Sequence, residues 1–418
     1  MKKHMRYAAW CLAVCLSLTA LFSCRKQEWE DEITDTVTST VPITDVQTTE
    51  TAEITETEAA TDIVTETETE TELQTESDTD APAITYPTVI DEYGKDTLTG
   101  IAPAAKGTHI DPLTGTAVSK EEAERRPIAV MLNNITAALP QQNVGAADVL
   151  YECQVEGYLT RLMGVFNDYA DLKALGSIRS SREYYIDFAA NHDAIYVHAG
   201  GSEEAYRNLK SRGTNNIDAV NDYVVSGFFY RDPNRVGKMS YEHTLVIDGE
   251  KINGAIAAKG YRTSYAKTFD NPLNFVGEGQ SIHLVNGTKA KQLTVKFGAH
   301  TTQLVYNAAQ NRYMRWQNGE KHVDGVTGEQ LGFENVIVLF CPYTQTKDDY
   351  NHIEVASTGK GSGYYLTGGK KVDIQWSKAT GDTQIMMYYA SGKELTLTPG
   401  KTNIEIVGYE SSTEILAN

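Results

Sequence analysis

Cysteine is scarce in this sequence, and basic residues are missing from one long segment of it. Five cysteines among 418 residues are too few for a disulfide-dense scaffold. Residues 27–94 contain no lysine or arginine and 20 acidic residues, so this segment alone carries −20 against −19 for the whole chain. Residues 95–418 carry a net charge of only −4. This balance excludes a broadly basic nucleic-acid-binding protein, which needs an excess of lysine and arginine on one face.

Common motifs of catalysis and cofactor binding are also missing. The sequence has no Gly-x-Ser-x-Gly, His-Glu-x-x-His, Gly-x-x-x-x-Gly-Lys-Ser/Thr or Cys-x-x-Cys pattern. These absences argue against the serine hydrolases, zinc peptidases, P-loop nucleotide-binding proteins and thiol oxidoreductases that use them. We therefore predict no cofactor and no metal, and no motif assigns a catalytic residue.

The amino terminus has the three-part layout of a secretory signal. Met1–Arg6 is basic, Tyr7–Phe22 is almost entirely apolar, and Leu21-Phe22-Ser23-Cys24 closes the run. This ending resembles a bacterial lipobox, in which the cysteine is acylated after cleavage before it. We expect a signal peptide at 1–23 and lipid on Cys24, which would anchor the protein to the outside of the cell membrane. An uncleaved signal anchor is the alternative.

Residues 24–94 form a predicted tether between the lipid and the folded body. Residues 31–80 contain 17 threonines and 16 acidic residues, a composition with few large apolar side chains to bury and strong self-repulsion. About 70 disordered residues give a coil span on the order of 45 Å, and about 230 Å when fully extended. The tether would hold the body away from the bilayer, as a passive spacer or in a sequence-specific role.

Residues 95–270 predict an α/β or α+β domain with a mixed sheet and covering helices. Short apolar runs bounded by turn formers indicate strands. One helix is expected from Ser180, as its N-cap, and a second begins at Ser202 after a Gly-Gly turn. Ser180 with Glu183 fits a capping box. The expected strands are 127–133, 149–155, 159–166, 194–198 and 244–247, and the expected helices are 180–191, 202–211 and 249–259.

Residues 271–418 predict a second, mainly β domain. Short runs rich in β-branched and aromatic residues are separated by turns such as Asn286-Gly287, Asn318-Gly319 and Ser391-Gly392. Such regular spacing favours a sandwich or a barrel-like arrangement of strands.

A series of short motifs runs along the body between about residues 120 and 410. The main ones are Arg126-Pro127-Ile128-Ala129-Val130-Met131, Ala147-Asp148, Tyr151-Glu152, Glu156-Gly157, Thr160-Arg161, Gly176 to Arg182, His198-Ala199-Gly200-Gly201-Ser202, Tyr313-Met314-Arg315, His322-Val323-Asp324, Trp376-Ser377-Lys378 and Leu397 to Thr402. Together and in this order, they resemble the YerB-like lipoprotein family of Gram-positive bacteria, whose function is unassigned. The resemblance implies a lipid-anchored envelope protein with two adjacent domains and no established catalytic residues.

The segment Arg179-Ser180-Ser181-Arg182 is the strongest candidate for a binding site. At a helix start, unpaired N–H groups and two guanidinium groups would form a clamp for an anion or a carboxylate. The alternative is that Ser180 only caps the helix, while Arg179 and Arg182 pair with internal acids such as Glu152 or Glu156.

His198 and Ser202 frame a Gly-Gly turn between a strand and a helix, where open sheets commonly bind ligands. His198 could act as a general base, or it could donate a structural hydrogen bond. Glu152 and Glu156 are expected on one face of a strand. With Arg161 they would form either a glycosidase-like carboxylate pair or an acid–arginine network.

Arg315, His322 and Asp324 flank the Asn318-Gly319 turn of the second domain. The histidine and the aspartate could bind a metal or orient a base, or the residues could form a solvated hairpin tip.

Cys153 and Cys341 are the cysteines of the predicted body. An extracytoplasmic location permits a disulfide between them, and two separate buried thiols are the alternative.

These features together predict a non-catalytic binding or accessory protein of the cell envelope. The expected partners are the bilayer, through acylated Cys24, and a cell-wall polymer or an envelope protein. The alternative is a hydrolase acting on envelope glycan or peptide, with Glu156 or His198 as acid or base.

Overall fold

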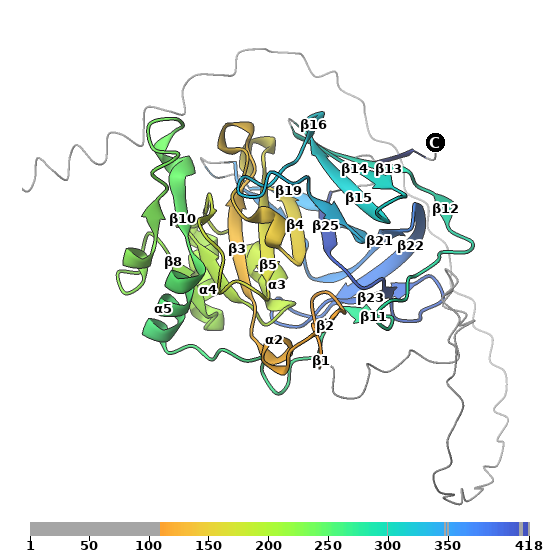
Figure 1. Cartoon of the computed structure of the whole chain (residues 1–418), viewed down its shortest axis with the longest axis horizontal. Coiled ribbons are helices and arrows are strands. Elements are labelled where there is room, and N and C mark those ends of the chain that lie inside the picture. Colours follow the sequence, from red (N-terminus) through yellow and green to blue (C-terminus); the bar gives the residue numbers. More distant parts are fainter. Residues whose placement is uncertain (1–108, 299, 347, 349–350, 409–412, 417–418) are drawn as a thin grey trace, which may run out of the picture. The chain divides into compact units, whose positions relative to one another are not determined.

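A computed structural model of the chain describes residues 109–298, 300–346, 348, 351–408 and 413–416 (Figure 1). The predicted signal peptide and tether lie outside these residues. No helix in the described part is long and apolar enough to cross a membrane.

One mixed sheet of 11 strands forms the centre of the described structure. Its order is β12-β22-β21-β18-β25-β4-β5-β3-β7-β8, and β23 pairs with β22. The strands are β3 (Ile128–Asn133), β4 (Val149–Gln154), β5 (Thr160–Phe166), β7 (Ile195–His198), β8 (Asn216–Asp218), β12 (Thr288–Lys289), β18 (Asn335–Phe340), β21 (Gly359–Thr367), β22 (Lys370–Lys378), β23 (Met386–Tyr389) and β25 (Thr402–Val407).

The two halves of the chain meet inside this sheet. Strand β25 runs parallel to both β4 and β18, with Glu405 opposite Glu152 and Ile404 opposite Ile337. The α/β first half and the mainly β second half are confirmed as fold classes. The boundary at 270 falls between α5 and β11 and stays a prediction.

Helices and a second sheet cover the two faces of the central sheet. Helices α3 (Glu183–Ala190) and α4 (Glu203–Arg212) contribute Tyr185 and Leu209 to one core, and α5 (Gly249–Lys259) contributes Ile252 to the other. Strand β3 is buried along its whole length because both of its faces are covered. The remaining helical segments are α2 (Lys120–Glu124), η1 (Thr136–Ala138), η2 (Val144–Ala146), η3 (Glu156–Tyr158), η4 (Ser226–Phe228) and η5 (Tyr241–Thr244).

The second sheet packs on the same side of the central sheet as α5. Its order is β16-β15-β14-β13-β26, and β17 pairs with β15. Leu293 and Leu304 of this sheet share a core with Leu150 and Val338 of the central one. The strands are β13 (Gln292–Phe297), β14 (His300–Asn307), β15 (Arg312–Gln317), β16 (Glu320–Lys321), β17 (Gly332–Phe333) and β26 (Thr413–Leu416).

Short strand pairs complete the described structure. They comprise β1 (His109–Ile110) with β2 (Ala117–Val118), β10 (Leu245–Ile247) between β6 (Leu175–Gly176) and β9 (Tyr230–Arg231), β11 (Asn274–Phe275) with β24 (Thr396–Leu397), and β19 (Tyr343–Gln345) with β20 (Ile353–Val355).

The predicted capping box at Ser180 is wrong. Helix α3 begins at Glu183, its N-cap is Arg182, and no side chain caps it. The segment before it is extended because its backbone bonds to the loop after β7: Ala199 N donates to Arg179 O, and Ser181 N donates to Gly200 O. Ser202 does cap α4, since its hydroxyl accepts a hydrogen bond from Ala205 N.

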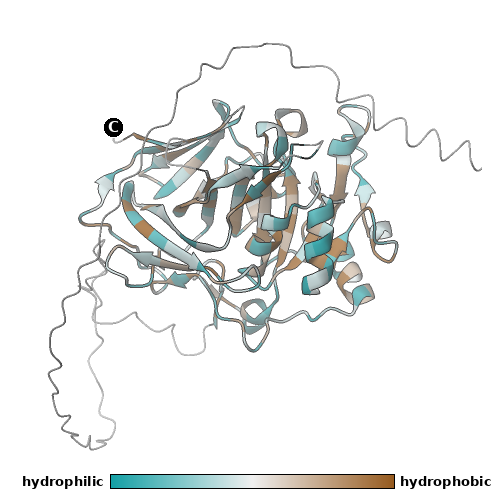
Figure 2. Ribbon diagram, turned by 180° about the vertical axis from the view of Figure 1, so that it is seen from behind, coloured by the Kyte–Doolittle hydropathy of each residue, from teal (hydrophilic) through white to brown (hydrophobic). Residues whose placement is uncertain are grey.

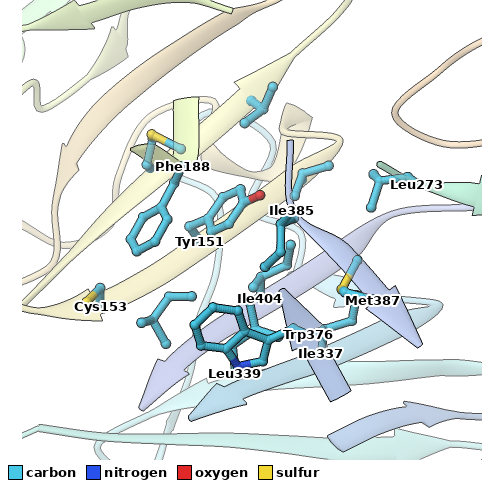
Figure 3. Close-up of a cluster of buried hydrophobic side chains, with 14 of the residues drawn as sticks. Tyr151, Cys153, Phe188, Leu273, Ile337, Leu339, Trp376, Ile385, Met387 and Ile404 are labelled. Atoms are coloured by element: carbon cyan, nitrogen blue, oxygen red, sulfur yellow. The ribbon is translucent and has the colours of Figure 1, made fainter. Parts of the chain in front are cut away.

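Side chains from both halves of the chain form the hydrophobic core. Apolar residues are concentrated in the central strands (Figure 2). Figure 3 shows Tyr151 and Phe188 of the first half beside Ile337, Trp376 and Ile385 of the second. The rings of Tyr151 and Phe188 are stacked, with centroids 5.4 Å apart.

Cys153 and Cys341 are separate buried thiols, the second of the two alternatives. Cys153 lies opposite Ile406, whose partner on the other side is Leu339 of β18, and Cys341 follows directly after β18. Cys153 and Leu339 are therefore two strand spacings apart, about 9.6 Å, and Cys341 lies two residues further along the chain. A disulfide requires Cα atoms within about 7 Å of each other.

Candidate functional site

The carboxyl ends of three parallel strands, β3, β7 and β8, lie at one edge of the central sheet. The extended segment 179–182 and the turn Gly200-Gly201 lie beside each other there, joined by the Ser181–Gly201 bridge. Such edges are common ligand-binding positions in open α/β sheets. We call this region the carboxyl edge.

Arg161 and Arg182 converge on one carboxylate at the carboxyl edge. Arg161 Nη2 lies 2.8 Å from Glu156 Oε1, while Arg182 meets the same carboxylate side-on, with Nε 3.0 Å from Oε2 and Nη2 against Oε1. Both arginine side chains are more than nine-tenths buried, and that of Glu156 is 25% exposed. The carbonyls of Ser180 and Ser181 accept further bonds from the two guanidinium groups.

The charges in this cluster shift the pKa values of its members. Burial alone would raise the pKa of Glu156, but Arg161 and Arg182 outweigh it and lower the pKa to about 2. Burial, reinforced by the charge of Arg182, lowers the pKa of Arg161 to about 10. Glu156 is therefore an ionised carboxylate at neutral pH, and it is poorly suited to donate a proton as a general acid.

Arg179 does not join this cluster as the second arm of a clamp. Its guanidinium lies 3.0 Å from Glu242, and its side chain is one-quarter exposed. The two-armed clamp of Arg179 and Arg182 on a helix start is therefore absent from the described structure. Ser180 lies beside the Gly200 turn, with its hydroxyl near the position that a side chain would occupy at Gly200.

His198 is enclosed at the end of β7. Its Nδ1 lies 2.8 Å from Gly200 O, and its Nε2 lies 3.2 Å from Asn216 Oδ1. Both ring nitrogens therefore have a protein group as partner, and Asp218 Oδ1 lies 3.8 Å from Nδ1. The side chain is fully buried, so the geometry supports the structural role of His198 and not the role of a general base.

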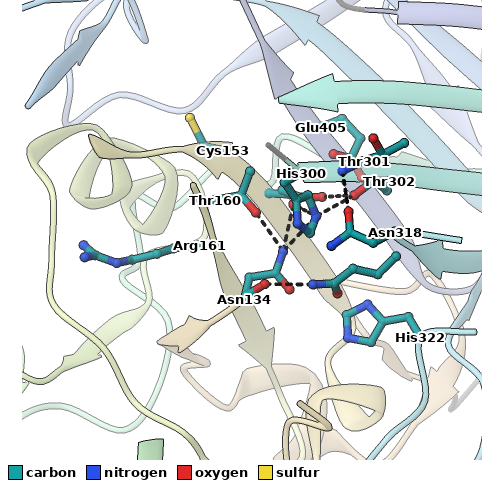
Figure 4. Close-up of polar contacts among 12 residues, drawn as sticks. Asn134, Cys153, Thr160, Arg161, His300, Thr301, Thr302, Asn318, His322 and Glu405 are labelled. Atoms are coloured by element: carbon teal, nitrogen blue, oxygen red, sulfur yellow. Dashed lines mark hydrogen bonds and ion pairs between the residues drawn. The ribbon is translucent and has the colours of Figure 1, made fainter. Parts of the chain in front are cut away.

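Glu152 lies on the opposite face of the sheet from Arg161 and Glu156. The predicted shared face of Glu152 and Glu156 is wrong, because β4 ends at Gln154 and Glu156 lies in the turn η3. Figure 4 shows Arg161 pointing away from the polar network that contains His300 and His322. A glycosidase-like carboxylate pair is therefore not formed.

Glu152 instead belongs to a buried network between the two sheets, which we call the inter-sheet network. At its centre, Arg315 makes five hydrogen bonds from its five N–H groups. The acceptors are His322 Nδ1 at 3.0 Å, Asn403 Oδ1 at 2.9 Å, Glu405 Oε1 at 2.8 Å, Thr302 Oγ1 at 3.1 Å and Glu152 Oε2.

The two carboxyl groups of this network differ in their donors. Glu152 is bonded by Asn134 Nδ2 at 2.8 Å, Thr302 Oγ1 at 2.6 Å and Arg315, with His300 at 3.0 Å. Burial raises its pKa, but Arg315 and His300 bring it well below the usual value. Oε2 of Glu405 has no partner in the described structure, and burial and the charge of Glu152 raise the pKa of Glu405 to about 8. Glu405 therefore holds a proton at neutral pH, and Arg315 and Glu152 are the charged pair.

His322 and Asp324 are buried, so the hairpin they flank is not solvated at these positions. His322 Nε2 donates to Gln141 Oε1 at 2.7 Å, which leaves Nδ1 to accept from Arg315. Asp324 accepts from the backbone of Gly145 at 2.8 Å and from the turn that follows it. The two side chains bind protein groups and do not face a common metal position. No group of three or more His, Cys, Asp or Glu in the described part could hold a metal ion.

The inter-sheet network includes residues that were not singled out from the sequence. Asn403 and Glu405 alternate with Ile404 and Ile406 in β25. This period-2 pattern predicts a strand with one polar face, so the sequence did carry a signal for these two residues. Asn134, His300 and Thr302 carry no comparable signal, because their partners lie far away in the sequence.

Exposed aromatic and aliphatic side chains lie around the carboxyl edge. Tyr158 is 64% exposed and follows Glu156 by two residues, while Val220 is 61% exposed and lies against Gly200. Tyr241, beside the Arg179 partner Glu242, is 65% exposed. Arginine and tyrosine are the residue types enriched in binding interfaces.

Comparisons with known proteins agree with the two-part organisation. The family models "Protein of unknown function (DUF3048) N-terminal domain" and its C-terminal counterpart match residues 113–262 and 293–404. The chain is similar to "Putative lipoprotein YerB" of Bacillus subtilis, with 29% identity over 301 residues, which are 71% of this chain and 85% of that protein. Its fold is similar to the crystal structure of YerB, with a TM-score of 0.64, 26% identity, and coverage of 73% of this chain and 99% of that one.

Proposed function

Because the chain belongs to the YerB-like DUF3048 family, we propose that it is a lipid-anchored extracytoplasmic protein with a binding role in the cell envelope. The name of the Bacillus relative supports the lipoprotein assignment. The ending Leu21-Phe22-Ser23-Cys24 supports acylation of Cys24.

The proposed ligand is an anionic component of the cell wall, bound at the carboxyl edge. The observation that carries this proposal is the charge ratio there: the guanidinium groups of Arg161, Arg179 and Arg182 have the carboxylates of Glu156 and Glu242 as their ion-pair partners. One positive charge remains in excess, and guanidinium groups bind carboxylates and phosphates through paired hydrogen bonds.

A non-catalytic role is supported by the state of the candidate acid and base groups. His198 and Glu152 are fully buried and bonded on all sides, and Glu156 is ionised between two arginines. A general acid or base must reach the proton that it transfers.

Sedimentation with purified cell-wall sacculi tests the binding role. The wild-type protein should co-sediment in a salt-sensitive manner, and R179A/R182A should lose most of this retention. The control is R207A, which removes an arginine 70% exposed on α4 and should bind as wild type does. Unchanged retention of R179A/R182A would contradict the proposal.

Mass spectrometry of the supernatant distinguishes binding from hydrolysis. A binding protein releases no wall fragments. Fragments that disappear with E156Q or H198A would instead identify the hydrolase.

A further inference from the structure

Glu156 serves two buried arginines with a single carboxylate. Among the described residues it is the only acid within ion-pair distance of Arg161 and of Arg182. Two guanidinium groups buried with one carboxylate leave an uncompensated positive charge, and burial makes such a charge costly. Arg179 lies close enough to add to the positive field at Arg161. The cluster therefore favours an additional or a stronger anion.

The existing contact is shaped for a planar carboxylate. Arg182 presents Nε and Nη2 side-on to the two oxygens of Glu156, the paired arrangement that matches a carboxylate. Arg161 contacts the same group through Nη2, at Oε1. Whatever replaces Glu156 in this cradle must offer two oxygens in one plane.

The turn that carries Glu156 lies outside the hydrogen-bonded part of the sheet. Val155 N donates to Leu159 O at 2.8 Å and closes the hairpin beneath the three residues of η3. Gly157 and Tyr158 both have left-handed backbone conformations, with φ of 65° and 59°. A left-handed conformation is unusual for a bulky residue such as tyrosine. Movement of this turn would leave the β4–β5 pairing intact.

Tyr158 follows Glu156 by two residues and is the exposed aromatic side chain of the same turn. It is 64% exposed, and its Cβ lies against Gly298 of the turn between β13 and β14. Its neighbour Leu159 is 42% exposed. An acid with an adjacent apolar or sugar group could contact these side chains while its carboxylate reaches the arginines.

We propose that Glu156 is an internal substitute for a ligand carboxylate, which displaces it from Arg161 and Arg182. This inference rests on the proposed binding role and specifies its ligand as a terminal carboxylate, such as those of wall stem peptides. In the absence of ligand, Glu156 neutralises part of the arginine charge. When a ligand binds, the turn η3 swings aside and Tyr158 packs on the ligand.

Binding of N-acetyl-D-alanyl-D-alanine, measured by isothermal titration calorimetry, tests this displacement. Removal of the competing carboxylate in E156Q should tighten binding by about tenfold or more, because the ligand no longer competes with an internal anion. R182K keeps the charge but loses the paired contact, and it should weaken binding at least tenfold. The C-terminal amide of the same dipeptide is the matched control and should bind to neither protein.

The inference is overturned if E156Q binds the dipeptide with the same affinity as the wild type or more weakly. The far-ultraviolet circular dichroism of E156Q must match that of the wild type, which shows that the variant is folded. Tighter binding of inorganic phosphate than of the dipeptide would overturn the carboxylate assignment. If E156Q does not fold, E156D serves instead, because its shorter side chain competes less well and should still bind the dipeptide more tightly than wild type.

Failure of this inference differs from failure of the binding role. One outcome is that retention of the wild type on sacculi depends on Arg179 and Arg182 while E156Q binds the dipeptide no more tightly than the wild type does. In that case only the proposed displacement of Glu156 is wrong. If retention does not depend on these arginines, the binding role itself is wrong.

Discussion

The substitution E405Q should remove part of the pH dependence of stability. Glu405 is fully buried in the inter-sheet network, and its Oε2 has no hydrogen-bond partner in the described structure. Burial and the nearby charge of Glu152 raise its pKa to about 8. Glutamine has nearly the same shape and keeps the carbonyl oxygen that accepts from Arg315 and Asn403. It cannot ionise.

The size of the effect follows from proton linkage. A carboxyl whose pKa is higher in the folded state contributes stability that is fully present below its unfolded pKa, near 4.5, and is lost as pH rises toward 8. In that window the slope for one group approaches about 1.4 kcal/mol per pH unit. Between pH 5 and pH 8 the wild type should therefore lose up to about 4 kcal/mol through Glu405, and E405Q should not.

Urea unfolding of both proteins at several pH values between 5 and 8.5 measures this difference. Other buried acids, such as Asp148 with its pKa raised by burial to about 7, contribute equally to both proteins and cancel. The matched control is E414Q, an exposed acid paired with Lys296, whose slope should equal that of the wild type. Identical slopes in E405Q and wild type would refute the assignment of the proton to Glu405.

Three further predictions concern the inter-sheet network, the thiols and the anchor. Glu152→Gln should lower the free energy of unfolding by about 3–5 kcal/mol at neutral pH, because Arg315 loses its charged partner in a fully buried site. Chemical denaturation measures this change, and a loss below about 1 kcal/mol would contradict the assignment of Arg315 and Glu152 as the charged pair. Cys153 and Cys341 should react with a maleimide only after unfolding, because both are buried and reduced. Mass spectrometry after denaturation without a reductant should show both thiols labelled, and unlabelled cysteines joined in a disulfide would contradict the separation of their strands. Cys24→Ala should release the protein from membranes into the medium, as detected by immunoblotting of cell fractions, and continued membrane association would contradict acylation.

Local patterns in the sequence were sufficient to predict most strands and helices. The run 127–133 was expected as a buried strand because it is a short apolar stretch bounded by turn formers, and β3 is buried along its whole length. A helix was expected over residues 202–211 after the Gly200-Gly201 turn, and α4 spans Glu203–Arg212 with Ser202 as its N-cap and Gly213 as its C-cap. These features depend on neighbours only a few residues apart.

Long-range pairing was not predictable in the same way. Ser180 has the right neighbours for a cap, but the backbone of segment 179–182 bonds to the loop after β7, and this tertiary contact overrides the local preference. The separation of Glu152 from Glu156 depends on where β4 ends, a boundary that the sequence leaves uncertain by a few residues. Arg315 was identified as a candidate, but its burial depends on Glu152 and Glu405, which lie far from it in the chain.

The position of β25 affects the order in which the protein can fold as it is synthesised. Strand β4 has β5 as one neighbour soon after it is synthesised, but its other neighbour begins only at Thr402, about 250 residues later. Until β25 arrives, β4 and β18 are both open sheet edges with apolar faces, which are prone to pair with other chains. A chain that emerges with its amino terminus first therefore needs protection of these edges until almost its entire length is available. This requirement would make the protein depend on folding factors more than two independent domains would.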